Sequence, residues 1–169
     1  ATITNIETGL PEYIHIKDTS KQIDAFRASG SMPFVSEIVD YEGNKYLDGA
    51  LGDSIPVLKA KEMGYDKIVV VLTQPEDFRK KKNPAWIAKL MYHKYPKLIE
   101  AINTRYLKYN ETLDIIKDLE KKKEIFVIRP SSPLNIKRIE KDLTKIDNVY
   151  DLGLKDAKKS LKKLKKYME

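Results

Sequence analysis

Several residue types that define common kinds of functional site are absent or scarce in this sequence of 169 residues. It has no cysteine, which excludes disulfides, thiolate metal sites and a cysteine nucleophile. His15 and His93 are its only histidines, so a histidine-based metal centre is nearly excluded. We therefore expect no metal.

Long hydrophobic runs are also lacking. The longest, Ile68–Leu72, is far shorter than a membrane span, and the first residues lack the basic and apolar regions of a signal peptide. These absences predict a cytoplasmic protein. The chain begins with Ala1, not methionine, so we expect the true N-terminus to lie upstream.

The net charge of +7 is distributed unevenly along the chain. Residues 1–74 carry a net charge of −4, whereas residues 75–169 carry +11. This leaves two interpretations of the basic part, a solvated lysine-rich helical surface or a surface that contacts anionic lipid or nucleic acid. No RNA-binding signature accompanies the lysines, so nucleic acid is not expected, while peripheral contact with an anionic membrane stays open.

Hydrophobic patterns predict a mixed α/β chain. The first third reads as short strands and turns with one helix, over residues 2–6, 13–16, 20–29 and 37–48. Two β-branched runs follow, at 67–73 and 123–129, and each is typical of a strand buried on both faces. The helical periodicity over 98–119 between them predicts a crossover onto a parallel sheet.

The end of the chain is predicted to be a helix with a narrow apolar seam. The seam residues recur at steps of three and four: Leu154, Ala157, Leu161, Leu164 and Met168. Lysine fills most of the other positions. We expect the seam to dock on the body of its own domain; the alternative is a helix that lies on an anionic membrane surface.

No complete catalytic motif is present. No serine has the G-x-S-x-G surroundings of an α/β-hydrolase nucleophile, and no phosphate-binding glycine pattern occurs. One segment does present a carboxylate: Asp48 ends an extended arm, and Gly49 and Ala50 follow at once, which suits a general base exposed in a cleft. The alternative is a strand-to-helix turn in which Asp48 or Asp53 only accepts hydrogen bonds from local backbone.

Three other residues are weaker candidates. The neighbours of His15 and His93 favour a surface position for both histidines. Arg129 ends the second β-branched run, where it would meet either an anionic headgroup at the C-terminal edge of the sheet or a surface ion-pair partner.

Taken in order, the segments Thr4–Gly9, Ala25–Pro33 and Tyr46–Val57 resemble the C-terminal half of the catalytic domain of patatin-like phospholipases. Thr4–Gly9 is similar to a strand and turn of that family, and Ala25–Pro33 is similar to its A-x-x-A-S-x-x-x-P segment. Tyr46–Val57 resembles its D-G-G/A motif with the trailing D-x-I-P. Gly64 and the strand over Ile68–Leu72 follow in the expected order. The segment from Arg129 to Leu134 and the tyrosine-rich helix before it look like the C-terminal extension of a bacterial subgroup.

The resemblance implies a serine acyl-ester hydrolase (a phospholipase, lysophospholipase or esterase of lipid degradation) with a Ser–Asp dyad. Such a reaction would need no metal and no organic cofactor. Asp48 would be the dyad aspartate, and Gly49 and Ala50 would shape its turn. The family's nucleophilic serine and glycine-rich oxyanion loop lie upstream of the matching region, so this chain would be an inactive fragment. Its partners would be a lipid or other acyl-ester substrate and the missing N-terminal half of the domain. The alternative is a non-catalytic interaction domain that binds anionic lipid or nucleic acid through its basic half.

The fold that this resemblance implies is a three-layer α/β/α fragment with a mainly parallel sheet. We expect residues 1–75 to form the C-terminal part of the catalytic core with the D-G-A motif. Residues 76–169 would form a helix-rich basic extension with one further strand at about 124–129, packed on the same core.

Overall fold

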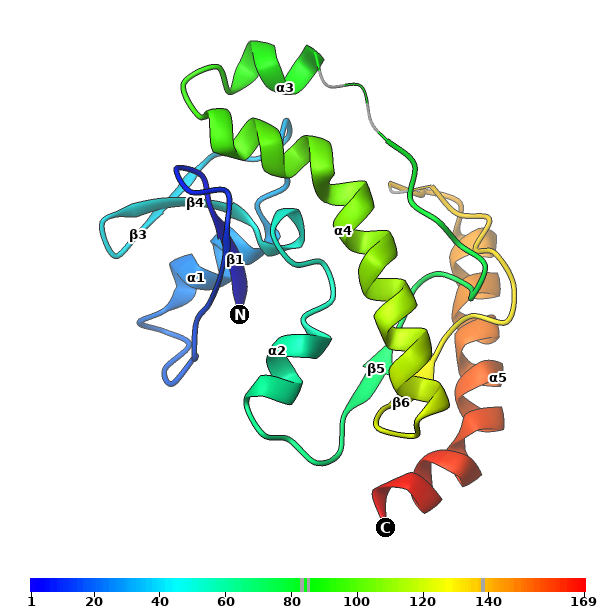
Figure 1. Cartoon of the computed structure of the whole chain (residues 1–169). Helices are drawn as coiled ribbons and strands as arrows, with labels where there is room; N and C mark the ends of the chain where they lie inside the picture. Colours follow the sequence, from blue (N-terminus) through cyan, green and yellow to red (C-terminus); the bar gives the residue numbers. More distant parts are fainter. Residues whose placement is uncertain (83, 85, 138) are drawn as a thin grey trace. The chain divides into compact units, whose positions relative to one another are not determined.

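The computed structural model describes residues 1–82, 84, 86–137 and 139–169. The chain divides into two compact units, each made of two segments (Figure 1). Unit 1 comprises residues 1–56 and 80–113, and unit 2 comprises residues 57–79 and 114–169. The predicted division at residue 75 follows the sequence motifs and stays a prediction.

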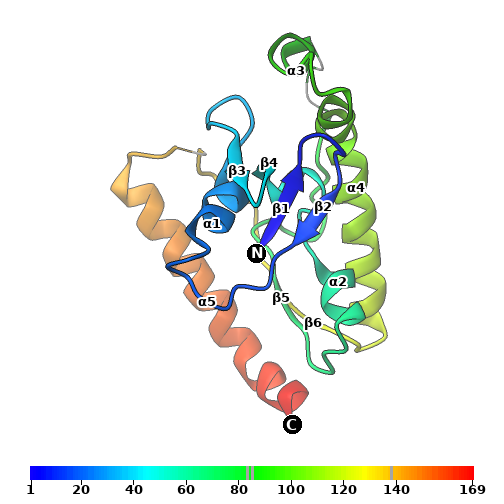
Figure 2. The same cartoon turned by 90° about the vertical axis from the view of Figure 1, so that its left-hand side faces the viewer.

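Unit 1 is organised around a four-stranded sheet in the order β2-β1-β4-β3, beside the helix α1 (Figure 2). The strands are β1 (Thr2–Asn5), β2 (Pro11–Tyr13), β3 (Val39–Tyr41) and β4 (Asn44–Asp48). The helices of the unit are α1 (Ile23–Gly30), the 3₁₀ turn η1 (Gly49–Leu51), α3 (Trp86–Met91) and the first part of α4 (Pro96–Lys121).

Two clusters of buried side chains lie on opposite faces of this sheet, because neighbouring strand residues point to opposite sides. Tyr46 belongs to the cluster that includes Ile3 and the α1 residue Ala25. Leu47, the next residue of β4, belongs to the cluster that includes Leu98 of α4. Both faces of β4 are thus packed just before Asp48.

All pairings in this sheet are antiparallel, so the expectation of a mainly parallel sheet is wrong for unit 1. The connections explain the difference. Residues 6–10 join β1 to β2, and Glu42 and Gly43, both with positive φ, join β3 to β4. Such links allow hairpins, whereas a parallel crossover needs a dozen or more residues.

Unit 2 contains the parallel pair that the two β-branched runs predict. β5 (Val69–Val71) pairs in parallel with β6 (Phe126–Ile128), which confirms the predicted crossover pairing. The helix α2 (Val57–Glu62), the last turns of α4 and the long helix α5 (Leu143–Met168) complete the unit. Burial of β5 on both faces is not observed: Val70 is buried, but Val71 is 70% exposed, because a two-stranded sheet leaves part of one face uncovered.

The helix α5 confirms the predicted tail helix but not the expected docking of its seam. Leu154, Leu161 and Met168 are 41%, 48% and 51% exposed. The helix is attached instead by an adjacent face: the Asp156 carboxylate accepts a hydrogen bond from the Ser131 amide at 2.8 Å, and the Tyr167 ring lies 5.7 Å from that of Phe126. The apolar seam thus lies on a face of the helix that these contacts do not cover. Within the described residues, no helix has the length and apolar character needed to cross a membrane.

Candidate functional site

Asp48 lies at the point where β4 ends and η1 begins. Its side-chain Oδ1 accepts a hydrogen bond from the Ala50 amide at 2.8 Å, so Asp48 caps the 3₁₀ turn. Its own amide donates to the Ser31 carbonyl at 2.8 Å. Among the described residues, the second carboxylate oxygen has no hydrogen-bond or ion-pair partner. The half-buried carboxylate is therefore held through one oxygen only.

The turn after Asp48 requires glycine because β1 and β2 approach it very closely. A Cβ on Gly49 would lie 2.1 Å from the carbonyl oxygen of Thr2. A Cβ on Gly52 would lie 2.7 Å from the backbone nitrogen of Pro11. Both clashes involve backbone, which cannot move aside as the end of a flexible side chain can. The glycine that follows Asp48 in the sequence motif is thus explained by the packing of β1.

A buried hydroxyl connects the two strands at this turn. The Thr4 side chain is fully buried, and its Oγ1 donates to the Asp48 carbonyl at 2.9 Å. The same oxygen accepts a hydrogen bond from the Gly52 amide at 3.0 Å. Thr4 therefore fixes both ends of η1 to β1, and with them the direction of the Asp48 side chain.

The second carboxylate of the motif is engaged differently. Asp53 Oδ2 accepts a hydrogen bond from the Tyr13 hydroxyl at 2.7 Å, and its Oδ1 accepts one from the Ile55 amide at 3.2 Å. Both oxygens of Asp53 thus have structural partners, whereas Asp48 keeps one without a partner. Local backbone bonding, the alternative raised by the sequence, accounts for the one bond of the Asp48 side chain, whereas Asp53 combines a local bond from Ile55 with a distant one from Tyr13.

Two features near the turn were not predicted from the sequence. The segment after α1 is tied to the motif, because the Ser31 carbonyl accepts from the Asp48 amide. The tyrosine hydroxyl of Tyr46 donates to Glu12 at 2.8 Å, and burial together with this bond raises the pKa of Tyr46 to about 12. Both contacts join residues more than 15 positions apart, which no local pattern signals.

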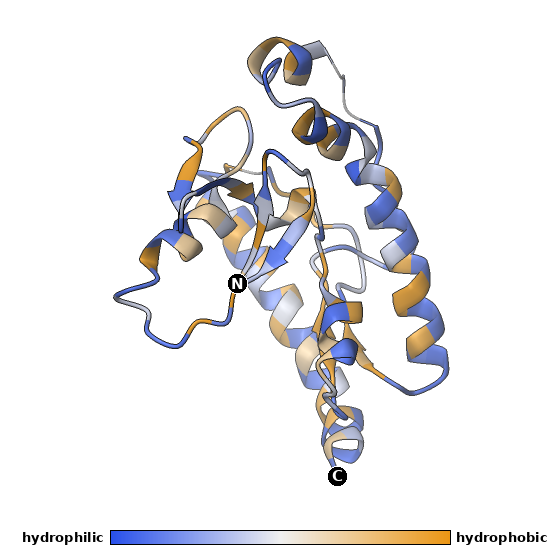
Figure 3. Ribbon diagram, turned by 60° about the vertical axis from the view of Figure 1, so that its left-hand side comes forward, coloured by the Kyte–Doolittle hydropathy of each residue, from blue (hydrophilic) through white to orange (hydrophobic). Residues whose placement is uncertain are grey.

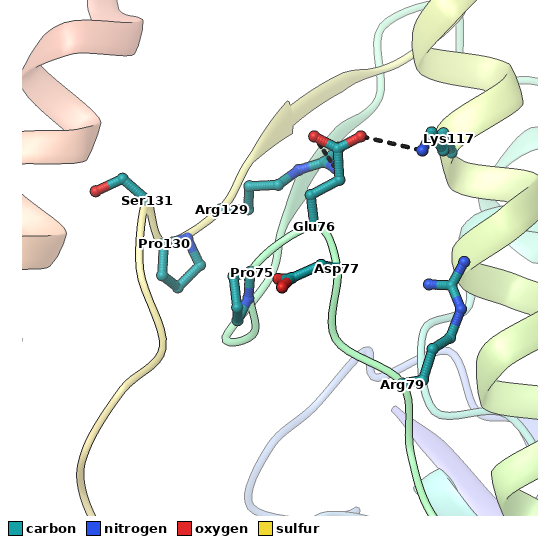
Figure 4. Close-up of a pocket in the computed structure, with 8 residues that line it drawn as sticks. All are labelled: Pro75, Glu76, Asp77, Arg79, Lys117, Arg129, Pro130 and Ser131. Atoms are coloured by element: carbon teal, nitrogen blue, oxygen red, sulfur yellow. Dashed lines mark ion pairs between the residues drawn. The ribbon is translucent and has the colours of Figure 1, made fainter.

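Arg129 lies in a pocket of about 610 Å³ in unit 2, at the C-terminal ends of β5 and β6 (Figure 4). Its guanidinium pairs with Glu120 and, at 3.7 Å, with Glu76. Glu76 also pairs with Lys117 at 3.3 Å, so its carboxylate lies between two cations in Figure 4. This arrangement supports the ion-pair interpretation of Arg129, since its charge is already compensated.

The remaining sequence candidates lie at the surface. His15 and His93 are both exposed, as predicted. Among the described residues, no group of three or more histidine, aspartate or glutamate side chains lies close enough together to hold a metal ion.

Two family models match separate parts of the chain. Residues 2–61 match the family Patatin-like phospholipase, which confirms the resemblance of this segment to patatin-like domains. Residues 95–169 match a second family, a domain of unknown function (DUF6363). The patatin-like segment contains β1 to β4 and Asp48, so the turn described above lies within it.

One curated relative is similar to a longer stretch of the chain. The chain is 28% identical over 136 residues to the uncharacterized protein YjjU of Escherichia coli (strain K12). The match covers 78% of this chain but only 38% of that protein. The chain thus corresponds to less than half the length of the relative.

Proposed function

We propose that this chain is part of a patatin-like serine acyl-ester hydrolase that acts on lipid and that Asp48 is the acidic member of its Ser–Asp dyad. One observation carries the proposal. Among the described residues, only one oxygen of the Asp48 carboxylate has a hydrogen-bond partner, and Asp48 lies within the segment that matches the patatin-like family. Asp53 is the other carboxylate of this turn, and both of its oxygens accept hydrogen bonds.

In this proposal Asp48 accepts the proton of a serine hydroxyl as the serine oxygen attacks the ester carbonyl. The proton then passes to the departing alcohol. In the second step the same carboxylate takes a proton from water as the water attacks the acyl-enzyme, and returns it to the serine oxygen as the acid leaves. The hydrogen bond from the Ala50 amide to Oδ1 holds the carboxylate in one orientation, and the close approach of Gly49 to Thr2 fixes the turn that carries it. Gly49 and Ala50 thus act as positioning residues.

The serine comes from outside this chain, since no serine here has the G-x-S-x-G surroundings. The missing N-terminal part of the domain would supply the nucleophile, the oxyanion loop and the further strands of a three-layer, mainly parallel fold. Exposed apolar residues fit an incomplete domain: Val35 of unit 1 and Val71 of unit 2 are 71% and 70% exposed. Alone, the chain is expected to be inactive, because removal of such a serine lowers the rate on the order of a millionfold.

A non-catalytic interaction domain was the alternative that the sequence left open. The comparisons match a phospholipase family and lend this alternative no support. In this proposal the basic half of the chain belongs to the same hydrolase.

Labelling with a fluorophosphonate serine probe tests the proposal on this chain and on the full product of its reading frame. We expect only the longer product to be labelled and the Asp48→Asn variant to lose labelling. The substitution is well suited because asparagine caps a helix start about as well as aspartate, so the Ala50 contact survives while the base is removed.

Asp53→Asn is the matched control, since it changes the neighbouring carboxylate of the same turn. We expect this variant to keep its labelling. Equal labelling of the Asp48→Asn variant and the wild-type product would overturn the role of Asp48. Labelling of the 169-residue chain itself would overturn the claim that its serine is missing.

A further inference from the structure

The C-terminal half of α5 presents an apolar stripe that its own unit does not cover. The stripe runs along residues 154–168, with Leu154, Leu161 and Met168 between 41% and 51% exposed. At 1.5 Å per residue it extends over about 20 Å. Figure 3 shows hydrophobic and hydrophilic residues alternating along this helix toward the C-terminus.

The attachment of α5 explains why this stripe stays open. Asp156 and Tyr167 lie about a quarter turn away from the stripe at 100° per residue, and they bind Ser131 and the ends of the two strands. The Tyr167 hydroxyl accepts from the Ile68 amide at 3.0 Å and lies 3.2 Å from the Glu124 carbonyl. The helix is thus fixed along one side, and its apolar stripe is presented beside the attached face.

The charge of this half of the helix limits what can cover the stripe. Seven of the residues from 155 to 166 are lysines, and Asp156, the one acidic residue among them, is buried against Ser131. Helical spacing places three of the lysines along the free border of the stripe: Lys158, Lys162 and Lys165. A second copy of the helix would bring lysine rows together, which disfavours self-association.

We propose that the C-terminal half of α5 binds the surface of an anionic membrane, with the apolar stripe inserted at the level of the headgroups. Lysines that border an apolar stripe contact lipid phosphates while their aliphatic stems cover the adjoining apolar surface. A bilayer accepts a convex row of side chains without a matching groove, and its negative charge complements the lysines. The proposal does not depend on Asp48 or on hydrolysis.

Flotation of the chain with vesicles tests it. The vesicles contain either phosphatidylcholine alone or phosphatidylcholine with about one third phosphatidylserine. We expect binding to the anionic vesicles that weakens as salt is raised from 50 to 500 mM, and little binding to the neutral ones. The Lys158→Gln/Lys162→Gln/Lys165→Gln variant should bind about a hundredfold more weakly. The Leu154→Gln/Leu161→Gln variant should lose about tenfold or more.

Two matched variants control for charge and for hydrophobicity. Lys89→Gln/Lys94→Gln/Lys108→Gln removes the same charge from exposed positions in unit 1, and Leu90→Gln/Leu107→Gln changes two exposed leucines there. Both should bind like the wild type. Equal losses in the control and test variants would overturn the proposal, because binding would then follow overall charge or hydrophobicity.

Three other results would also overturn it. Loss of binding in the lysine variant but not in the leucine variant would mean that the stripe does not insert. A dimer in light scattering that Leu154→Gln/Leu161→Gln dissociates, without vesicle binding, would identify a second copy as the occupant. Binding by the chain but not by the full product of the reading frame would show that the rest of that protein covers the stripe.

Discussion

The contacts inside unit 1 differ in kind from the contacts inside unit 2. In unit 1 the backbones of β1 and β4 approach so closely that Gly49 leaves no space for a methyl group, and the Thr4 hydroxyl is buried between them. In unit 2 a two-stranded sheet is joined to α5 through Asp156 and Tyr167. The comparison teaches that close backbone packing fixes a single carboxylate, whereas attachment by a few side chains leaves an apolar surface open for a partner.

The largest difference between the units is expected from substitution of glycine. Gly49→Ala forces a methyl group onto the Thr2 carbonyl and should lower the free energy of unfolding by about 3 kcal/mol or more. Gly153→Ala, within α5, meets no atom within 4 Å and should raise it by up to about 1 kcal/mol. Urea denaturation of the two variants measures both effects. Similar changes in the two variants would contradict the contrast in packing.

A smaller loss of stability is expected when the buried hydroxyl of Thr4 is removed. Thr4→Val keeps the shape of the side chain but removes the hydroxyl that donates to the Asp48 carbonyl and accepts from the Gly52 amide, at a cost of about 1–3 kcal/mol. Thr112→Val is the control, since that hydroxyl donates only to the Lys108 carbonyl of its own helix at the surface. Thermal unfolding of both variants should show a lower Tm for Thr4→Val alone. A loss as large in Thr112→Val would mean that burial of Thr4 is not the cause.

The smallest effect is expected in unit 2 and depends on pH. The amide hydrogen bond from Ser131 lowers the pKa of Asp156 below its ordinary value. A lowered carboxylate pKa stabilises the fold above the unfolded value of about 3.9, and this contribution is lost as the pH falls through the folded pKa. Unfolding measured from pH 2.5 to 7 should show that Asp156→Asn removes this part of the acid sensitivity.

Asp151→Asn removes an exposed carboxylate from the same helix and serves as the control for the pH profile. An unchanged acid profile in the Asp156→Asn variant would contradict the proposed attachment of α5 through this residue. The same profile in both variants would assign the pH dependence to the overall charge of the helix.

The sequence predicted those features that depend on local pattern. The helical periodicity over 98–119 and the flanking β-branched runs predicted α4 and the parallel pair β5–β6, because each element carries its own period. The D-G-A motif placed Asp48 at the end of a strand, because the glycine that follows it marks a turn.

Features that depend on distant partners were predicted wrongly or missed. The apolar seam of α5 identified an apolar face but not the face that is attached, since attachment depends on Ser131 and the strand ends. The need for glycine at position 49 arises from Thr2, which lies 47 positions earlier. The parallel sheet was wrong for unit 1 because short turns return its strands in the opposite direction.

The hydrogen bond between Ile68 and Tyr167 also has a consequence for folding during synthesis. β5 waits for its partner β6, which follows 57 residues later, and Ile68 meets the Tyr167 hydroxyl only after 99 residues. At the usual rate of translation this second interval lasts about 5–20 s. The hairpins of unit 1 close within a few residues, whereas β5 leaves the ribosome with its edges and Val71 exposed. During synthesis, β5 therefore presents an unpaired strand edge of the kind that chaperones protect.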